Sequence, residues 1–215
     1  MVTTLLAVRG FRERTDDAFR RELVALAKRR QLNPSYLAAV MSFETGATFD
    51  PAIRNPSSSA TGLIQFMGST ARMLGTTTEE LASMTQLEQL AYVERYFERI
   101  GRALETVSDH YMAVFAPSGI GKPSSFPLYS APSSAYEANQ ALDKDGDGVI
   151  SVGDASAPVE GIVAQARREL PIIVSDEPSA PPSSPGGAVT RSSSGFAALF
   201  AVGAGLWAWL RNRRR

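Results

Sequence analysis

A single acid, Glu44, stands at the end of an apolar stripe with helical spacing. Leu37, Val40 and Met41 precede it by seven, four and three positions, which places these side chains on one face of a helix. A carboxyl group carried inward on such a face is desolvated, and desolvation raises its pKa toward neutrality. General acid catalysis of glycosidic cleavage requires a carboxylic acid that is still protonated at about pH 6 to 7. The spacing therefore favours Glu44 as a catalytic acid.

The alternative is a glutamate at a helix end that is solvated, or that pairs with Arg54 or Arg72. In either case Gly46 would end the helix, because glycine readily leaves the helical conformation. The stripe alone leaves both interpretations open.

A polar side chain among apolar neighbours follows about twenty residues later. Gln65 lies in the segment A-T-G-L-I-Q-F-M, residues 60–67. Its amide can donate and accept hydrogen bonds to a sugar acetamide or hydroxyl group, while Phe66 or Met67 would pack against a sugar ring. Gly62 would permit close approach of a saccharide to the backbone. The segment predicts a substrate-binding loop that includes Gly62, Gln65 and Phe66.

The S-F-E-T-G segment around Glu44, followed by this loop, resembles the soluble lytic transglycosylase branch of the goose-type lysozyme superfamily. A third segment, H-Y-M-A-V-F, resembles the family's A-Y-N-A-G pattern at Tyr111, but has Met112 and Val114 where Asn and Gly are usual. This variant looks more like the cell-wall lysins of phages than like housekeeping enzymes. The resemblance covers roughly residues 15 to 155.

The resemblance implies cleavage of the β-1,4 bond between N-acetylmuramic acid and N-acetylglucosamine in peptidoglycan. Glu44 would protonate the leaving oxygen, and the substrate's own acetamido group would stabilise the cationic intermediate. Glu44 would then act as a base on the C6 hydroxyl, so that a 1,6-anhydro end forms. Tyr111 would help to orient the acid. The implied partners are peptidoglycan glycan strands.

Two alternatives remain open at this point. A muramidase that hydrolyses the bond needs a second carboxylate, and the candidates are Asp50 and Asp109. Asp50 precedes Pro51, a pair that is typical of a turn. An inactive lysozyme-like protein that only binds the wall is the other alternative. The aromatic residues Phe115, Tyr92 and Tyr96 would line a saccharide groove or belong to the core.

Residues 143–154, DKDGDGVISVGD, have the spacing of an EF-hand calcium loop. Ile150 stands where such loops place an inward-facing apolar residue. The final ligand is Asp where Glu is usual, and the alternative is an acidic surface turn. The pattern predicts a structural calcium ion whose ligands are Asp143, Asp145, Asp147, the carbonyl of Val149, and Asp154.

Helical signals dominate the first hundred residues. Asn33 followed by proline begins one helix, and two capping-box spacings, at Thr77 and Thr85, begin two more. Ser69 or Thr70 would begin another. A later helix is predicted over 159–169. We therefore expect a mainly α, lysozyme-like catalytic domain over 1–140 and a calcium loop with a helix over 141–175.

The C-terminal part has a different composition. Residues 176–194 are rich in Pro, Ser and Gly, which predicts a flexible tether. Nineteen uncharged residues then separate Arg191 from Arg211, and at about 1.5 Å per residue they span about 28 Å. Residues 195–215 are therefore predicted to form a single transmembrane helix with a basic end. Its small residues would support pairing with another such helix.

Composition excludes several functions. The 215 residues include no cysteine and one histidine, His110, so disulfides and zinc sites are not expected. The formal net charge is zero, and without the four terminal arginines it is −4. Such a body is a poor binder of nucleic acid.

The first residues do not resemble a signal peptide. We expect attachment to a virion membrane or a bacterial inner membrane, with the catalytic domain facing peptidoglycan.

Overall fold

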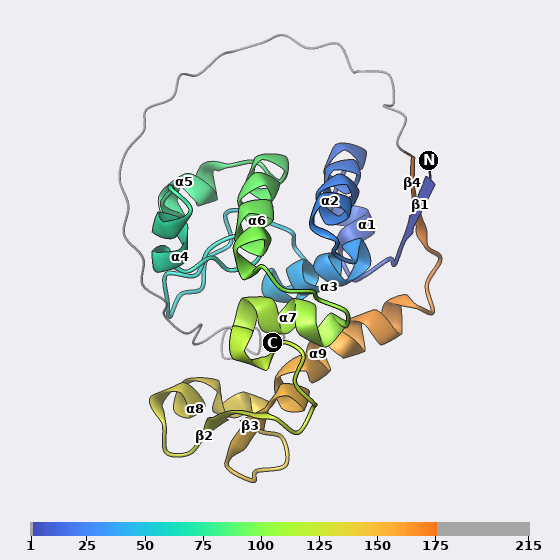
Figure 1. The fold of residues 1–215 in the computed structure, drawn as a ribbon. Helices are drawn as coiled ribbons and strands as arrows, with labels where there is room; N and C mark the ends of the chain where they lie inside the picture. The colour runs from blue at the N-terminus through green and yellow to red at the C-terminus, as the bar shows by residue number, and fades with distance from the viewer. Residues whose placement is uncertain (1, 176–215) are drawn as a thin grey trace.

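Helices make up most of the computed structural model, which describes residues 2–175 (Figure 1). The prediction of a mainly α fold is confirmed. No helix within this range is both long and apolar enough to span a bilayer. The predicted tether, 176–194, and the predicted membrane helix, 195–215, lie outside the described residues.

Nine α-helices lie within the described range. They are α1 (Phe11–Arg14), α2 (Asp17–Arg30), α3 (Pro34–Glu44), α4 (Gly68–Met73), α5 (Thr78–Ser83), α6 (Gln86–Ile100), α7 (Val107–Phe115), α8 (Ser134–Asn139) and α9 (Val152–Ala166). Two single 3-10 turns, η1 (Pro117–Gly119) and η2 (Gln140–Leu142), accompany them. The strands are β1 (Val2–Leu5), β2 (Pro127–Ser130), β3 (Val149–Ser151) and β4 (Ile172–Ser175).

The predicted helix starts are confirmed where a capping side chain marks them. The side chain of Asn33 accepts hydrogen bonds from two backbone N–H groups in the first turn of α3. Thr77 and Thr85 each form a complete capping box, at the starts of α5 and α6. Helix α4 begins at Gly68, slightly earlier than predicted, and no side chain caps it.

Helix α3 lies at the centre of the core. Nine of its eleven residues are buried, and α2, α7 and α9 pack around it. The prediction of one inward-facing stripe was therefore too narrow. The helix carries no charged residue before its last position, Glu44, and a helix that is apolar on all sides is stable when it is buried on all sides.

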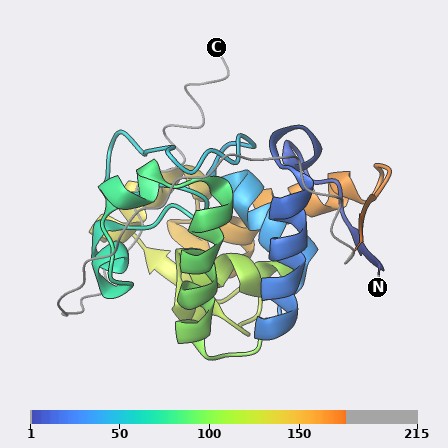
Figure 2. The ribbon, with the colours of Figure 1, turned by 90° about the horizontal axis from the view of Figure 1, so that it is seen from above.

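Helices α2 and α6 lie side by side in two perpendicular views (Figures 1 and 2). Ion pairs join them at the surface, including Arg29 to Glu94 (2.7 Å) and Arg30 to Glu98 (2.8 Å). Exposed pairs contribute at most about 1 kcal/mol each. Their main effect is to fix the register of α6 beside the rest of the helical body.

Helix α9 begins at Val152, seven residues before the predicted start at 159. Ser151 and Asp154 form a capping box there, and the helix accommodates Pro158 in its interior. Helix α9 packs on α3 and α7, and β4 pairs antiparallel with β1. The predicted boundary between residues 140 and 141 therefore does not coincide with a break in the core.

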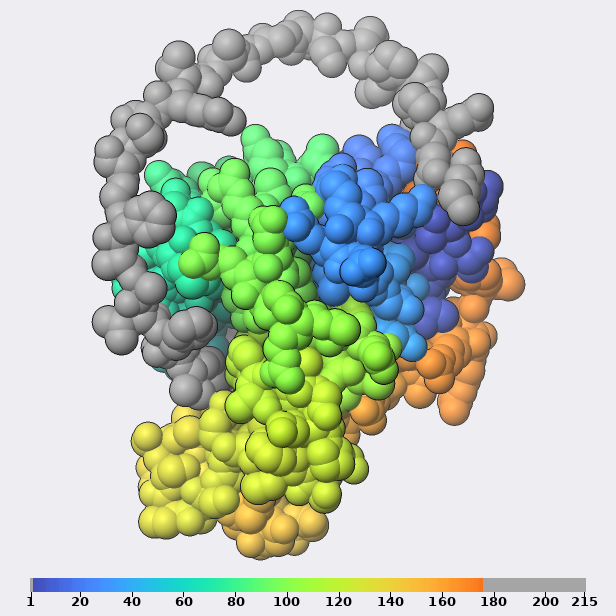
Figure 3. Space-filling view, viewed as in Figure 1, coloured from blue at the N-terminus to red at the C-terminus, as the bar shows by residue number. Residues whose placement is uncertain are grey.

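Strands β2 and β3 form a second antiparallel pair, next to α8. Together these elements form the lobe that projects from the helical body in the space-filling view (Figure 3). Ile150, in β3, is completely buried, as the loop pattern predicts. The lobe joins the body through α7 and α9, the helices that precede and follow it.

Candidate active site

Glu44 is the last residue of α3 and is only 4 % exposed. Its carboxyl group makes no hydrogen bond or ion pair with any residue in the described range. Desolvation raises the pKa of Glu44 to about 8. Arg54 pairs with Glu79 instead, at 3.4 Å. The predicted burial is thus confirmed, and the interpretation of a solvated glutamate, or of one paired with Arg54, is wrong.

The turn after Glu44 fixes the end of the helix. The Thr45 hydroxyl donates to the Met41 carbonyl oxygen (2.7 Å) and accepts from the Phe49 N–H (3.0 Å). Gly46 adopts a left-handed conformation with φ of 59°, which ends the helix as predicted. The acid is therefore held where the central helix stops.

Two tyrosines from neighbouring helices lie close to the acid. Burial raises the pKa of Tyr96, in α6, to about 12, and the charge of Glu44 contributes. The Tyr96 hydroxyl donates to the Ala113 carbonyl oxygen at 2.7 Å. Burial and the charge of Glu44 also raise the pKa of Tyr111, in α7. The structure thus brings the predicted Tyr111 to the acid and adds Tyr96, which the sequence did not separate from core aromatics.

The Gly62 part of the predicted loop is packed against α6. Gly62 is buried with φ of +83°, and a Cβ there would lie 2.3 Å from Oε1 of Gln89. That oxygen accepts from the Leu63 N–H (2.6 Å), and the Gln89 amide nitrogen donates to the carbonyl oxygens of Pro51 (3.0 Å) and Leu81 (2.8 Å). The prediction that Gly62 makes room for a saccharide is wrong. The glycine makes room for Gln89.

Of the two residues predicted to pack against a sugar ring, Phe66 is too deeply buried for this role, whereas Met67 is half-buried. Phe66 is only 2 % exposed, because its ring packs edge-on against Tyr96 with centroids 6.3 Å apart. The neighbouring sequence does not determine whether Phe66 is exposed, and the tertiary fold buries it. The contact nevertheless connects the loop to the acid, since Tyr96 also senses the charge of Glu44.

Gln65 has one satisfied and one unsatisfied end. Its backbone is left-handed, with φ of 51°, and its amide nitrogen donates to the Gly62 carbonyl oxygen at 3.1 Å. Its Oε1 is buried and lacks a hydrogen-bond partner, and it is the only such side-chain atom found within residues 2–175. A buried acceptor without a donor is costly. The structure therefore leaves a buried, unpaired acceptor in the loop where the sequence predicts substrate binding.

Both candidates for a second catalytic carboxylate accept hydrogen bonds from backbone N–H groups. Asp50 accepts from the Ala52 N–H (2.8 Å) and begins a turn, which confirms the interpretation of its pairing with proline. Asp109 accepts from the Thr106 hydroxyl (2.8 Å) and from the Gly121 N–H (2.7 Å). Burial opposes ionisation of Asp109, but its hydrogen bonds outweigh this effect and lower its pKa. Both carboxylates have structural roles.

His110 is fully buried, between α7 and the start of α3. The backbone N–H of Asn33 donates to Nε2 (3.1 Å), so Nδ1 carries the proton and faces the Thr106 carbonyl oxygen (2.7 Å). Burial lowers the pKa of His110, although the Thr106 carbonyl and Asp109 oppose this. Protonation of Nε2 would place two hydrogens face to face at the residue that caps α3.

We expect the imidazole to titrate with a midpoint below 6.5, its ordinary value. Because the folded state resists this proton, His110 makes the protein less stable as the pH falls below 6.5. NMR can follow this ring without ambiguity, since it is the only histidine. A midpoint at or above 6.5 would contradict the arrangement described.

The acidic loop forms a partial metal site. Carboxylate oxygens of Asp143, Asp145 and Asp147 all lie within 4.8 Å of one another and could hold a metal ion. Asp154 does not join them: its carboxylate accepts from the N–H (2.9 Å) and the hydroxyl of Ser151 and caps α9. Its prediction as a ligand is therefore not supported by the geometry. Val149 follows the cluster at the start of β3, opposite Ser130.

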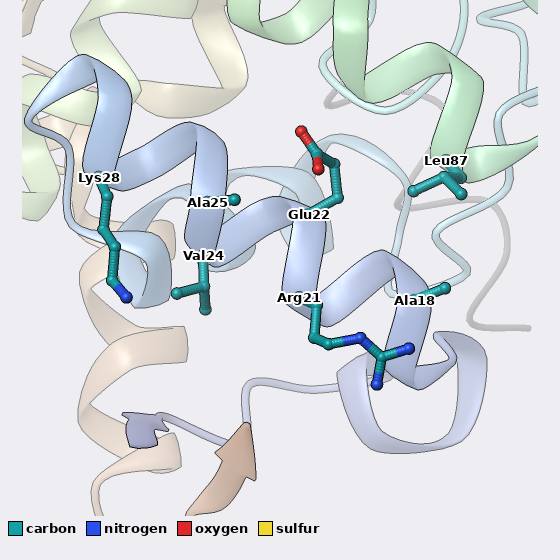
Figure 4. Close-up of a pocket in the computed structure, with 7 residues that line it drawn as sticks. All are labelled: Ala18, Arg21, Glu22, Val24, Ala25, Lys28 and Leu87. Atoms are coloured by element: carbon teal, nitrogen blue, oxygen red, sulfur yellow. The ribbon is translucent and has the colours of Figure 1, made fainter. Parts of the chain in front are cut away.

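A separate hollow of about 480 Å³ lies along α2 (Figure 4). Its one acid, Glu22, pairs with Arg29 at 2.6 Å. It includes none of the predicted site residues, and it has no buried acid comparable to Glu44. The lining residues are Ala18, Arg21, Glu22, Val24, Ala25, Lys28 and, from α6, Leu87.

No protein-family model and no curated protein matches the chain.

Proposed function

We propose that the chain is a peptidoglycan lytic transglycosylase of the lysozyme-like type, in which Glu44 is the catalytic acid. The observation that carries the proposal is the state of this carboxyl group. It is buried and has no partner in the described range, and its pKa of about 8 keeps it protonated at neutral pH. A buried acid without a partner costs stability, and such a cost is typical of functional sites.

The proposed reaction returns the proton to its source. Glu44 donates its proton to the glycosidic oxygen as the bond to C1 of N-acetylmuramic acid breaks. The substrate's acetamido group stabilises the positive charge that develops at C1. The Glu44 carboxylate then removes the proton from the C6 hydroxyl, and O6 bonds to C1. The product is a 1,6-anhydro end, no water is consumed, and Glu44 is protonated again.

The surroundings of Glu44 favour this chemistry over hydrolysis. An ordinary hydrolase needs a second carboxylate about 5 to 9.5 Å from the first, as a nucleophile or as a base for water. The two predicted candidates, Asp50 and Asp109, are bound to backbone groups. These hydrogen bonds support a mechanism that uses only the carboxyl group of Glu44. The muramidase is the second candidate function.

Gln65 supports a saccharide as the substrate. Its Oε1 is unpaired but buried, so an acetamide N–H or a sugar hydroxyl would donate to it after the Gln65 side chain turns toward the substrate. That bond would satisfy the buried acceptor only when substrate is present. The amide would therefore favour substrates that carry a hydrogen-bond donor at this position.

Mass spectrometry of muropeptides released from purified peptidoglycan tests the proposed chemistry. A transglycosylase releases anhydro products that are about 18 Da lighter than the hydrolysed muropeptides, because no water is added. Hydrolysed products would identify a muramidase. Undigested walls would favour the inactive wall-binding alternative.

We further propose that the acidic triad binds a structural calcium ion. Its support is the convergence of three carboxylates, which repel one another without a cation. Calcium at millimolar concentration is expected to raise Tm by about 5 °C or more, through preferential binding to the folded state.

Asp145→Asn should abolish this rise, and Glu137→Gln, a change at an exposed acid in the nearby α8, should leave it intact. Differential scanning fluorimetry gives both results. An equal rise in wild type and Asp145→Asn would exclude the triad as the site.

The sequence outside the described range supports a location. The predicted tether and membrane helix would hold the catalytic body within reach of glycan, on a virion or bacterial membrane, and pairs of such helices would self-associate through the stripe Ala197, Ala201 and Gly205.

A further inference from the structure

A row of aromatic rings leads from the acid toward the surface. Tyr111, beside Glu44, stacks on Phe115 with centroids 5.5 Å apart and planes 14° apart. Phe115 in turn packs against Tyr129 of β2, with centroids 5.8 Å apart at 71°. The row therefore joins the end of α7 to the first strand of the projecting lobe (Figure 1).

Exposure increases along this row. Tyr111 is 1 % exposed, whereas Phe115 and Tyr129 are both half-buried. The Tyr129 hydroxyl makes no hydrogen bond with the described part of the chain, and it contributes to the raised pKa of Tyr111. Phe115 and Tyr129 thus combine partly open ring surface with a free hydroxyl, next to the residues that surround the acid.

The backbone holds Tyr129 in a fixed place. Tyr129 lies opposite Ile150 in the β2–β3 pair, and Ile150 is completely buried. The preceding residue, Leu128, packs so close to Gly119 that a Cβ on that glycine would lie 3.0 Å from it. Because the backbone that carries the ring is held in place, little main-chain freedom is lost on binding a ligand, which favours affinity.

We propose that Tyr129 and Phe115 form a binding subsite for an N-acetylated sugar of the glycan strand, adjoining the bond cleaved at Glu44. The inference rests on the proposed function and assigns the substrate's path away from the acid, toward the projecting lobe. The apolar face of a pyranose ring would pack on the aromatic rings, and its hydroxyl or acetamide group would bond to the Tyr129 hydroxyl.

Binding is measured separately from catalysis, in the full-length Glu44→Gln variant, by calorimetric titration with the hexasaccharide of β-1,4-linked N-acetylglucosamine. Adding Tyr129→Ala is expected to weaken binding about tenfold, as for loss of one aromatic contact. Tyr129→Phe keeps the ring and should lose only about fivefold, for one neutral hydrogen bond. Tyr36→Ala, at a half-buried tyrosine near the start of α3 and outside the row, is the matched control and should leave binding unchanged.

Circular dichroism confirms that each variant is folded. If Tyr129→Ala does not fold, Tyr129→Leu keeps apolar contact with Phe115 and provides the same test. If the hexasaccharide is too short to bind, co-sedimentation of the same variants with purified peptidoglycan replaces calorimetry.

If the Glu44→Gln protein binds the saccharide equally well with and without Tyr129→Ala, the subsite proposal is wrong, while the proposed function is unaffected. An equal loss in Tyr36→Ala would also overturn it, because the effect would not be local to the row. If no saccharide or peptidoglycan binds any variant, and the native chain releases no muropeptides, the proposed function itself fails.

Discussion

Glu44→Gln is expected to lower the rate of muropeptide release from purified walls by about 100-fold to 10,000-fold, the usual contribution of a general acid. The amide has nearly the same size as the carboxyl group but has no proton to give to the glycosidic oxygen. Glu160→Gln makes the same chemical change at an exposed site on α9, and it should leave the rate unchanged. Equal release by all three proteins would show that Glu44 is not the acid.

The same variant should be more stable than the wild type at neutral pH. The pKa of Glu44 rises from 4.5 to about 8 on folding, so the folded state holds a proton that the unfolded state releases between these values. This group therefore destabilises the fold as the pH rises through that window. The difference is about 3 kcal/mol at pH 7, from 1.36 kcal/mol per pKa unit.

Denaturant unfolding of wild type and Glu44→Gln at about pH 4.5 and pH 7 measures this difference, which should be small at the lower pH and large at the higher. Activity of the wild type should fall as the pH rises through about 8, where the acid ionises. A variant that loses activity together with stability would instead indicate that Glu44 supports the fold.

Gly62→Ala is expected to destabilise the protein by more than 3 kcal/mol, with correspondingly low activity. A methyl group there lies 2.3 Å from Oε1 of the buried Gln89, and the backbone φ of +83° is itself unfavourable for alanine. Relieving the clash would break hydrogen bonds that Gln89 makes to three backbone segments. The cost combines strain with unpaired buried polar groups.

Gly75→Ala separates the two causes. Gly75 has φ of +77° but has no atom within 4 Å of the position of an added Cβ, so it has only the backbone cost, about 1 to 2 kcal/mol. Urea unfolding of both variants gives the difference that belongs to Gln89. Similar losses for the two would mean that the Gln89 contact is not restrictive.

Local signals predicted the helices well where a side chain satisfies the first turn, as at Asn33, Thr77 and Thr85. The start of α9 at Val152 differs from the prediction because Ser151 and Asp154 lie within the calcium-loop pattern, although their spacing is also that of a capping box. The pairing of β1 with β4 could not be predicted, because it joins four-residue strands from opposite ends of the described chain.

The candidate site also combines features that the local sequence determines with features that depend on long-range packing. The burial of Glu44 follows from its place on an apolar helix, so the sequence was sufficient. The covering of Phe66 by Tyr96, and the filling of space at Gly62 by Gln89, depend on where α6 lies. No periodicity within residues 60–67 carries that information. The unpaired, buried oxygen of Gln65 is likewise a consequence of packing, and its role in binding stays a prediction.

The β1–β4 ribbon has a consequence for biosynthesis. Val2 faces Ser175 across it, so β1 must wait until nearly the whole described body has been synthesised before its partner strand exists. Until then Leu5, which ends up completely buried, lacks its cover from Ile172. A nascent chain completes its tertiary structure only when such distant segments meet, so a ribosome stalled before β4 would carry an unfinished, aggregation-prone intermediate.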